Sequence, residues 1–261
     1  MKELEENITE LSSMKKYPSS IFYDGDLELL KRTKISIVGS RRPTKYSRMQ
    51  IQKLSSSLVR AGVCVVSGGA MGIDAIAHQG ASSCNTIAVL PCGIDIRYPA
   101  VNKNLLNDIQ KDGLLLSQFD VGFRATPWSF VLRNEVVVAL GDVLVVGEAD
   151  EGSGTMRSVE FALAMGKEIY VLPQRLGESA ATNKLLAQGK AKAIYDIDEF
   201  VSRFKKDDDL ALHVEKVEDD FITFCKTNPS YDETLARFPD RVFEAELSGD
   251  IKIINGKVFL T

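Results

Sequence analysis

Three short glycine-containing turns follow three apolar segments of this 261-residue chain, and two adjacent arginines lie in the first turn. A buried strand that ends in such a turn and leads into a helix exposes N–H groups at the positive end of the helix dipole. This arrangement is suited to holding phosphate, and an arginine could add a bidentate grip. The turns are Gly39-Ser40-Arg41-Arg42, Ser67-Gly68-Gly69 and Ser153-Gly154-Thr155.

A fourth group of candidate binding residues is Arg133-Asn134, which follows Trp128 and Phe130 closely along the chain. We expect one of these two aromatic residues to be in the core and the other to be available for stacking on a base. A basic groove with aromatic surfaces is how proteins commonly hold single-stranded nucleic acid. The sequence does not indicate which of Arg41 and Arg42 would face a phosphate.

Residues for covalent chemistry are not recognisable in the sequence. There are only two histidines, and no serine–histidine–acid set or Gly-Lys-Ser/Thr phosphate loop is apparent. We expect His78 to line or cap a helix rather than to transfer protons. The four cysteines lack the spacing of metal ligands, and the first strand is not followed by the G-x-G-x-x-G of dinucleotide-binding enzymes. We therefore expect no catalytic residue, no metal and no cofactor, and a protein that is not an enzyme.

Charge is distributed unevenly along the chain, although the net charge is only −4. Residues 34–100 carry eight Lys/Arg and two acidic residues, whereas residues 205–261 carry eight basic and thirteen acidic residues. A polyanion should therefore meet the first region and avoid the last.

Short apolar segments alternate with segments of helical length between residues 34 and 204. This alternation predicts right-handed βαβ crossovers and an α/β fold, an extended Rossmann-like and mostly parallel sheet with helices on both faces. All three turns would then lie at the carboxyl ends of strands, where such sheets bind ligands. The expected strands are 35–38, 63–66, 86–90, 114–117, 143–146 and 169–172, and the expected helices include 44–61, 72–83, 101–111 and 155–165.

We expect an N-terminal arm over residues 1–33, the Rossmann-like domain over 34–204, a charged linker over 205–218 and a small domain over 219–261. The small domain is predicted to hold helices near 219–226, 231–238 and 240–247 and a hairpin turning at Asn255-Gly256, a favoured type I′ pair. Three helices closed by a hairpin are winged-helix-like. Because the segment is acidic, a protein contact or a structural role is favoured over DNA binding.

No apolar run approaches the roughly 18 residues that a membrane helix needs. The first residues are acidic and polar, unlike the start of a secretory signal. We therefore expect a cytoplasmic protein without membrane contact.

The chain resembles the DprA/Smf family of DNA-processing proteins over about residues 17–204. The motifs that carry the resemblance are residues 37–44, 65–74, 86–90, Tyr98-Pro99, Phe130, Arg133-Asn134 and Ser153-Gly154. The resemblance implies an extended Rossmann-like domain that binds incoming single-stranded DNA in natural transformation, forms a homodimer and helps to load the recombinase RecA. It also implies DNA contacts at the three turns and at Arg133-Asn134.

The alternative is a nucleotide-processing enzyme, because phosphoribohydrolases of the same superfamily carry a Pro-Gly-Gly-x-Gly-Thr signature followed by a glutamate. Gly152-Ser153-Gly154-Thr155 is similar, but it lacks the proline. The third residue after Thr155 is Ser158, and the next acid is Glu160, two positions later. This mismatch in spacing disfavours the enzyme.

Overall fold

The computed structural model describes residues 2–205, 220–248 and 251–260. The chain divides into two compact units, residues 1–207 and 208–261. The predicted linker therefore lies outside the described residues apart from Lys205. Across the described residues, no helix combines the length and the apolar character that crossing a bilayer requires.

The larger unit is built on a nine-stranded sheet in the order β1-β2-β6-β5-β4-β3-β7-β8-β9. The seven strands from β6 to β9 in this order run parallel, and β2 joins β6 antiparallel. The predicted fold class is thus confirmed. The strands are β1 (Lys2–Glu3), β2 (Phe22–Gly25), β3 (Lys34–Val38), β4 (Cys64–Ser67), β5 (Thr86–Leu90), β6 (Leu114–Ser117), β7 (Val143–Val146), β8 (Ile169–Val171) and β9 (Lys192–Ala193).

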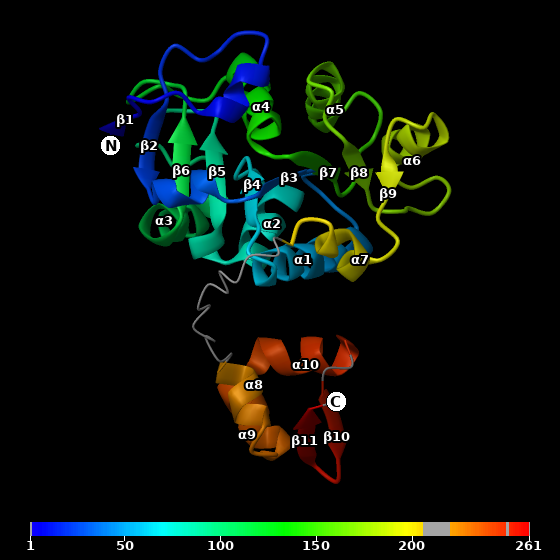
Figure 1. Ribbon diagram of the computed structural model, residues 1–261. Coiled ribbons are helices and arrows are strands. Elements are labelled where there is room, and N and C mark those ends of the chain that lie inside the picture. Colours follow the sequence, from blue (N-terminus) through cyan, green and yellow to red (C-terminus); the bar gives the residue numbers. More distant parts are fainter. Residues whose placement is uncertain (1, 206–219, 249–250, 261) are drawn as a thin grey trace. The chain divides into compact units, whose positions relative to one another are not determined.

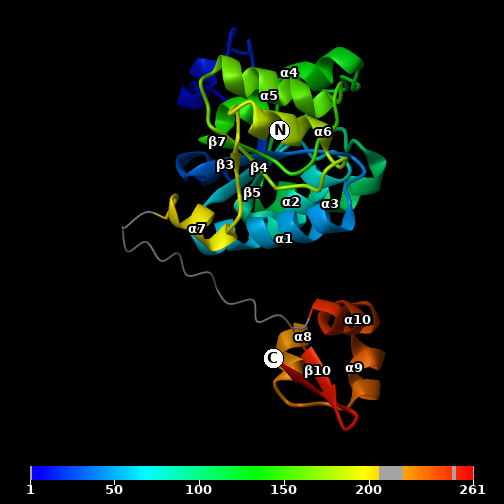
Figure 2. The same ribbon diagram turned by 90° about the vertical axis from the view of Figure 1, so that its right-hand side faces the viewer.

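Helices cover both faces of this sheet (Figures 1 and 2). One layer contains α1 (Lys45–Arg60), α2 (Ile73–Ala81), α3 (Lys103–Asp112) and α7 (Ile197–Ser202). The other contains α4 (Pro127–Leu140), α5 (Gly154–Ala164) and α6 (Ala180–Ala187). Short 3-10 helices span Thr9–Ser13, Leu27–Lys31, Ser83–Asn85 and Ala100–Asn102.

Local sequence explains where the helix of the first crossover begins and which face it buries. Thr44 caps α1 by accepting a hydrogen bond from the Ser47 N–H at 3.2 Å. Ile51, Leu54 and Leu58 then recur at helical spacing, and all three are fully buried. The predicted helices 44–61, 72–83, 101–111 and 155–165 correspond to α1, α2, α3 and α5 within a few residues.

The direction of winding changes at β3. The chain moves from β3 through β4 and β5 to β6, and then returns through α4 to β7 on the other side of β3. The carboxyl ends of β3 and β7 therefore lie next to each other with their following helices on opposite faces, and Val38 is paired with Val146. Such a switch point is where open α/β sheets form ligand crevices.

The predicted N-terminal arm is part of this sheet domain. Phe22 to Gly25 form β2, which pairs with β6 at the sheet edge. Leu11 and Leu29 are fully buried in the same core as the strands. This segment belongs to the domain because its apolar side chains cover strands near the sheet edge and pack against α4, where apolar surface would otherwise be exposed to solvent.

The smaller unit contains α8 (Asp220–Cys225), α9 (Tyr231–Arg237) and α10 (Pro239–Ser248), followed by a hairpin of β10 (Ile251–Ile254) and β11 (Lys257–Leu260). Asn255 and Gly256 both have positive φ, 51° and 76°, as a type I′ turn requires. The predicted helices and hairpin are confirmed. They enclose their own core of Phe221, Cys225, Val242, Ala245, Ile251 and Val258.

Candidate nucleic-acid interface

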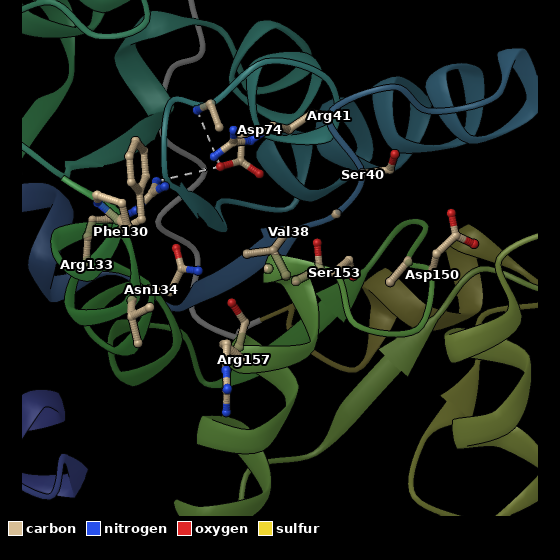
Figure 3. Close-up of a pocket in the computed structure, with 18 residues that line it drawn as sticks. Val38, Ser40, Arg41, Asp74, Phe130, Arg133, Asn134, Asp150, Ser153 and Arg157 are labelled. Atoms are coloured by element: carbon tan, nitrogen blue, oxygen red, sulfur yellow. Dashed lines mark hydrogen bonds and ion pairs between the residues drawn. The ribbon is translucent and has the colours of Figure 1, made fainter. Parts of the chain in front are cut away.

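A cavity of about 640 Å³ lies at the switch point between β3 and β7 (Figure 3). Its walls come from the turn after β3, the segment from the turn after β4 into α2, the turn after β7, the start of α5 and the first two turns of α4. Eight of the twelve predicted binding residues line it, so segments far apart in sequence meet here. They are Gly39, Ser40, Arg41, Arg133, Asn134, Ser153, Gly154 and Thr155.

The two adjacent arginines are separated by this geometry. Arg41 lines the cavity, and its guanidinium carbon lies 5.4 Å from the centre of the Phe130 ring. That distance is within the range of a cation–π contact, which holds the charge at the cavity wall. Arg42 is exposed and does not line the cavity, and its backbone N–H donates to Ser40 Oγ at 3.1 Å. Arg41 is therefore the better placed of the two to hold a phosphate in the cavity.

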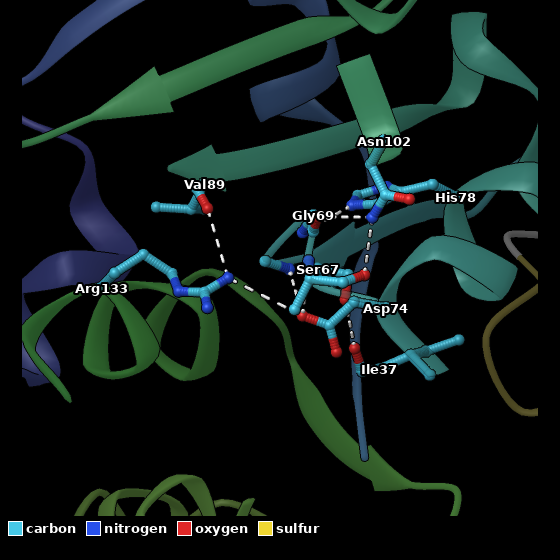
Figure 4. A network of polar contacts seen from close by, with 10 residues as sticks. Ile37, Ser67, Gly69, Asp74, His78, Val89, Asn102 and Arg133 are labelled. Atoms are coloured by element: carbon cyan, nitrogen blue, oxygen red, sulfur yellow. Dashed lines mark hydrogen bonds and ion pairs between the residues drawn. The ribbon is translucent and has the colours of Figure 1, made fainter. Parts of the chain in front are cut away.

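The second glycine turn does not offer free amides to the cavity, contrary to the sequence prediction. The N–H groups of Gly68 and Ala70 donate to the carboxylate of Asp74, at 3.2 and 3.4 Å, and the N–H of Gly69 donates to His78. Ser67 is fully buried and donates its hydroxyl to the Ile37 carbonyl. Through these amides the turn binds the carboxylate of Asp74, which in turn faces Arg133 (Figure 4).

His78 belongs to a buried chain of hydrogen bonds that crosses from α2 to the sheet (Figure 4). Its Nε2 accepts from the Gly69 N–H at 3.2 Å, so the ring proton is on Nδ1, which donates to Thr86 Oγ1 at 2.7 Å. Thr86 in turn donates to the Val65 carbonyl at 2.7 Å. Burial lowers the pKa of His78 to about 3, so the ring is neutral. Of the two predicted roles, lining or capping a helix, the structure shows the first, since His78 is a buried residue within α2.

This neutral histidine predicts a loss of stability in acid. Between pH 6.5 and about 3 the unfolded chain binds a proton at His78 that the folded chain does not, so stability falls as pH falls through this window. The expected slope is about 1.4 kcal/mol per pH unit. Urea unfolding of the wild type and of His78→Gln at several pH values measures it. The difference in the free energy of unfolding between the two proteins should change with pH below 6.5, the ordinary pKa of histidine, and stay constant above it. A difference that is constant at all pH values would contradict this account.

Arg133 is the most deeply buried charge of the cavity wall, at 3% exposure. Its Nη1 lies 3.7 Å from the Asp74 carboxylate and donates to the Val89 carbonyl at 3.4 Å. Burial raises the pKa of Asp74, and Arg133 and the amides of Ala70 and Gly68 oppose this shift. Burial also lowers the pKa of Arg133, which Asp74 opposes. Asp74 was not among the predicted site residues. Its place in the first turn of a predicted helix is visible in the sequence, but nothing in the sequence indicates that it pairs with Arg133.

Unsatisfied hydrogen-bonding groups remain at this wall. The Nε of Arg133 and the Oγ of Ser153 are inaccessible to solvent, and neither has a partner within the described part of the chain. Ser153 also precedes the first residue of α5 without capping it through its side chain. Buried polar atoms normally have partners, so the hydrogen-bonding capacity of this wall is not fully used within the described part of the chain.

The acidic residues near the third turn are mostly engaged away from the cavity. Glu148 accepts hydrogen bonds from the N–H and the hydroxyl of Thr44, each at 2.9 Å, and so fixes the start of α1. Glu151 pairs with Lys184 at 2.7 Å. Asp150 is exposed and lines the cavity. Of these three carboxylates, only that of Asp150 therefore lines the cavity. Arg157 also lines the cavity, although the sequence motifs did not indicate it.

The basic segment 34–100 contributes fewer cations to this surface than its sequence indicates. Lys34 is 3% exposed and pairs with Glu10 at 2.6 Å. Arg97 is bound by Asn107, Gln110 and the Ile94 carbonyl. The sequence count therefore overstates the positive charge available to a polyanion.

The family model of DNA recombination-mediator protein A matches residues 4–205, which include the whole cavity wall. This chain belongs to the DprA/Smf family. DNA processing protein DprA of Streptococcus pneumoniae is 33% identical over 200 residues, which are 75% of this chain and 70% of that protein. The Bacillus subtilis DprA is 34% identical over 194 residues, which are 72% of this chain and 65% of that protein.

Two solved DprA structures share the fold of this family member. That of Helicobacter pylori DNA processing protein A, which binds single-stranded DNA, has a TM-score of 0.76 and 38% identity, covering 77% of this chain and 94% of that one. The Streptococcus pneumoniae DprA structure has a TM-score of 0.71 and 32% identity, covering 76% and 71%. The family model ends at residue 205, so the confirmed resemblance extends over the sheet domain and not the smaller unit.

In this DprA/Smf member the glutamate considered for the alternative enzyme is not in the cavity. Glu160 is exposed, pairs with Arg157 at 2.7 Å and lines a separate hollow between α5 and α6. A general acid or base has to reach the reacting atoms. Nucleotide hydrolysis is therefore not favoured by the position of this glutamate, and we do not propose it.

Proposed function

We propose that this protein binds single-stranded DNA in the cavity between β3 and β7. The observation that carries the proposal is the meeting of Arg41, Asn134 and the start of α5 in one cavity. These groups are donors, and a phosphate or base offers acceptors. The single-stranded DNA binding of the H. pylori relative supports the same ligand.

The size and position of the cavity favour a single strand over a duplex. A cavity of about 640 Å³ is within the range of small-ligand sites, so it can enclose a few atoms of an extended strand but not a double helix. Backbone contacts from arginine and from amides carry no sequence information. We therefore expect little dependence of binding on base sequence.

We further propose, from the recombination-mediator name of the family, that the bound strand is handed to RecA by a homodimer. Light scattering tests the dimer. RecA-dependent strand exchange on DNA coated with a single-strand-binding protein tests the transfer, which should be faster with this protein present. An unchanged rate, from protein that binds DNA normally, would contradict the transfer.

The test of DNA binding is a salt series with labelled oligothymidylate, measured by fluorescence anisotropy. Arg41→Ala should weaken binding about 10- to 150-fold at low salt, since a hydrogen bond to a charged group is worth about 1.5–3 kcal/mol. The slope of log affinity against log salt should become less negative by about 0.7 for each phosphate that is no longer neutralised.

Arg60→Ala is the matched control, because Arg60 is an exposed arginine at the other end of α1, away from the cavity. Its removal changes net charge by the same amount but should leave affinity and slope nearly unchanged. Equal losses in the two variants would show diffuse attraction to charge and would count against the cavity.

A further inference from the structure

The first two turns of α4 direct apolar side chains outward and polar ones inward. Trp128, Val131 and Leu132 are 53%, 38% and 39% exposed, whereas Ser129 is fully buried and Arg133 is 3% exposed. A helix that only covers a sheet has the opposite distribution, whereas the later residues of α4, from Val136 to Leu140, are all buried. A contiguous exposed apolar surface commonly marks an interaction site.

The Trp128 ring is held in place by two phenyl rings. Phe119 and Phe123 stack on each other with centres 4.7 Å apart, and the Trp128 ring meets them edge-to-face at 5.7 and 5.5 Å. Packing of this kind restricts the indole while about half of it stays exposed. An immobilised aromatic loses little conformational freedom on binding.

This surface is continuous with the cavity. Pro127 and Val131, the residues one before and three after Trp128, both line the cavity wall. Phe130, which contacts Arg41, lies on the same helix (Figure 3). A strand leaving the cavity on this side therefore passes the Trp128 ring within one helical turn.

Charges of both signs surround the Trp128 ring, and continuity with the cavity is what favours a nucleic-acid strand over an apolar protein segment. Trp128 lies at the N-terminal end of a 14-residue helix, where the dipole is positive. Arg124, in the loop just before, is exposed. Of the acids nearby, Asp95 accepts hydrogen bonds from the Gly122 N–H, and Asp120 is exposed.

We propose that Trp128, flanked by Leu132, is a second nucleotide subsite, on which a base of the single strand stacks after the strand leaves the cavity. The subsite rests on the proposed function, since it extends the same path. It would lengthen the bound stretch of DNA without neutralising a further phosphate. Base–aromatic stacking accepts every base, so sequence tolerance is kept.

Trp128 is the only tryptophan of the chain, so intrinsic tryptophan fluorescence reports on this position alone. The full-length protein is titrated with oligothymidylates of about 4 and about 16 nucleotides, the limits of site size for a single-strand-binding OB fold. Tryptophan emission and the anisotropy of a label on the DNA are recorded in the same samples. The variants are Trp128→Ala, Trp128→Phe, and Tyr195→Ala as a control for an exposed aromatic elsewhere.

The longer strand should quench the emission, and Trp128→Ala should weaken its binding about 5- to 150-fold, the range for loss of one stacked base. Trp128→Phe should restore most of the affinity, and the shorter strand should bind all variants almost equally. The salt slope should not change in Trp128→Ala, which separates stacking on the indole from the phosphate binding that Arg41→Ala removes.

Normal anisotropy with no quenching, and no effect of Trp128→Ala, would overturn the subsite and leave the proposed function standing. Absence of any binding by the wild type would remove the proposed function and the subsite together. Emission that changes on dilution without DNA would assign the surface to contact between copies of the chain and would overturn the subsite.

Discussion

Arg133→Met is expected to lower the free energy of unfolding by about 3–5 kcal/mol, the usual cost of leaving one partner of a buried ion pair alone. The reason is the burial of Asp74, which is 6% exposed and lies 3.7 Å from the guanidinium. Methionine fills similar volume but cannot compensate the carboxylate charge. Urea unfolding of the two proteins measures the loss.

The double variant with Asp74→Asn should recover much of this loss. The asparagine carbonyl can still accept from the N–H groups of Gly68 and Ala70, and no buried charge remains. Arg157→Met is the control, because Arg157 forms an exposed ion pair with Glu160 and should cost at most about 0.5 kcal/mol. If Arg133→Met cost no more than this control, Arg133 would not compensate a buried carboxylate charge at Asp74.

The same pair explains why Arg133 could be selected from the sequence but its environment could not. Arginine beside asparagine after two aromatics pointed to binding, and Arg133 does line the cavity. What the sequence does not contain is the packing of α4 against the turn after β4, which buries the guanidinium. A Cβ on Gly68 would lie only 2.8 Å from the Asp74 carboxylate and would collide with Arg133. The glycine there makes room for a side chain rather than for a ligand.

Periodicity and turn chemistry predicted six of the seven parallel strands, seven of the α-helices and the C-terminal hairpin, since each has a local cause. Elements without a local signal were missed. The strand β2 lies between β1 and β6, and its four residues show no alternation of buried and exposed side chains. The helix α4 lacks an inward apolar stripe in its first turns, so its sequence shows no helical amphipathicity there. Because the first turns of α4 place apolar side chains outward, Trp128 is exposed.

The amides of the three turns illustrate a second limit. All three turns were expected to offer N–H groups to phosphate, but those of Gly68, Gly69 and Ala70 are satisfied within the chain. Sequence spacing places a turn at a strand end, whereas the occupation of its amides depends on side chains from the next helix. The turn after β3 and the start of α5 remain at the cavity.

Gly72→Ala is expected to cost more than about 3 kcal/mol in stability and to abolish single-strand binding. Gly72 has φ 79° and ψ −127°, a conformation that only glycine adopts without strain. An added Cβ would also lie 2.7 Å from Cα of Arg41 and would overlap the Ser40 carbonyl. These neighbours are backbone atoms, so the turn that carries Arg41 has to move.

Gly166→Ala is the control that separates the cost of backbone strain from the effect of displacing the Ser40-Arg41 turn. Gly166 also has positive φ, 68°, but a Cβ there would meet nothing within 4 Å. Its cost should be limited to the about 1–2 kcal/mol of the left-handed conformation, with DNA affinity unchanged. Urea unfolding and oligothymidylate anisotropy, the latter under conditions where both variants are folded, measure the two effects. A Gly72→Ala protein that is folded and binds DNA as Gly166→Ala does would show that the Ser40-Arg41 turn can yield without loss of function. A loss of binding in the folded Gly72→Ala protein alone would instead tie DNA affinity to the position of this turn, because neither substitution removes a charge or a donor.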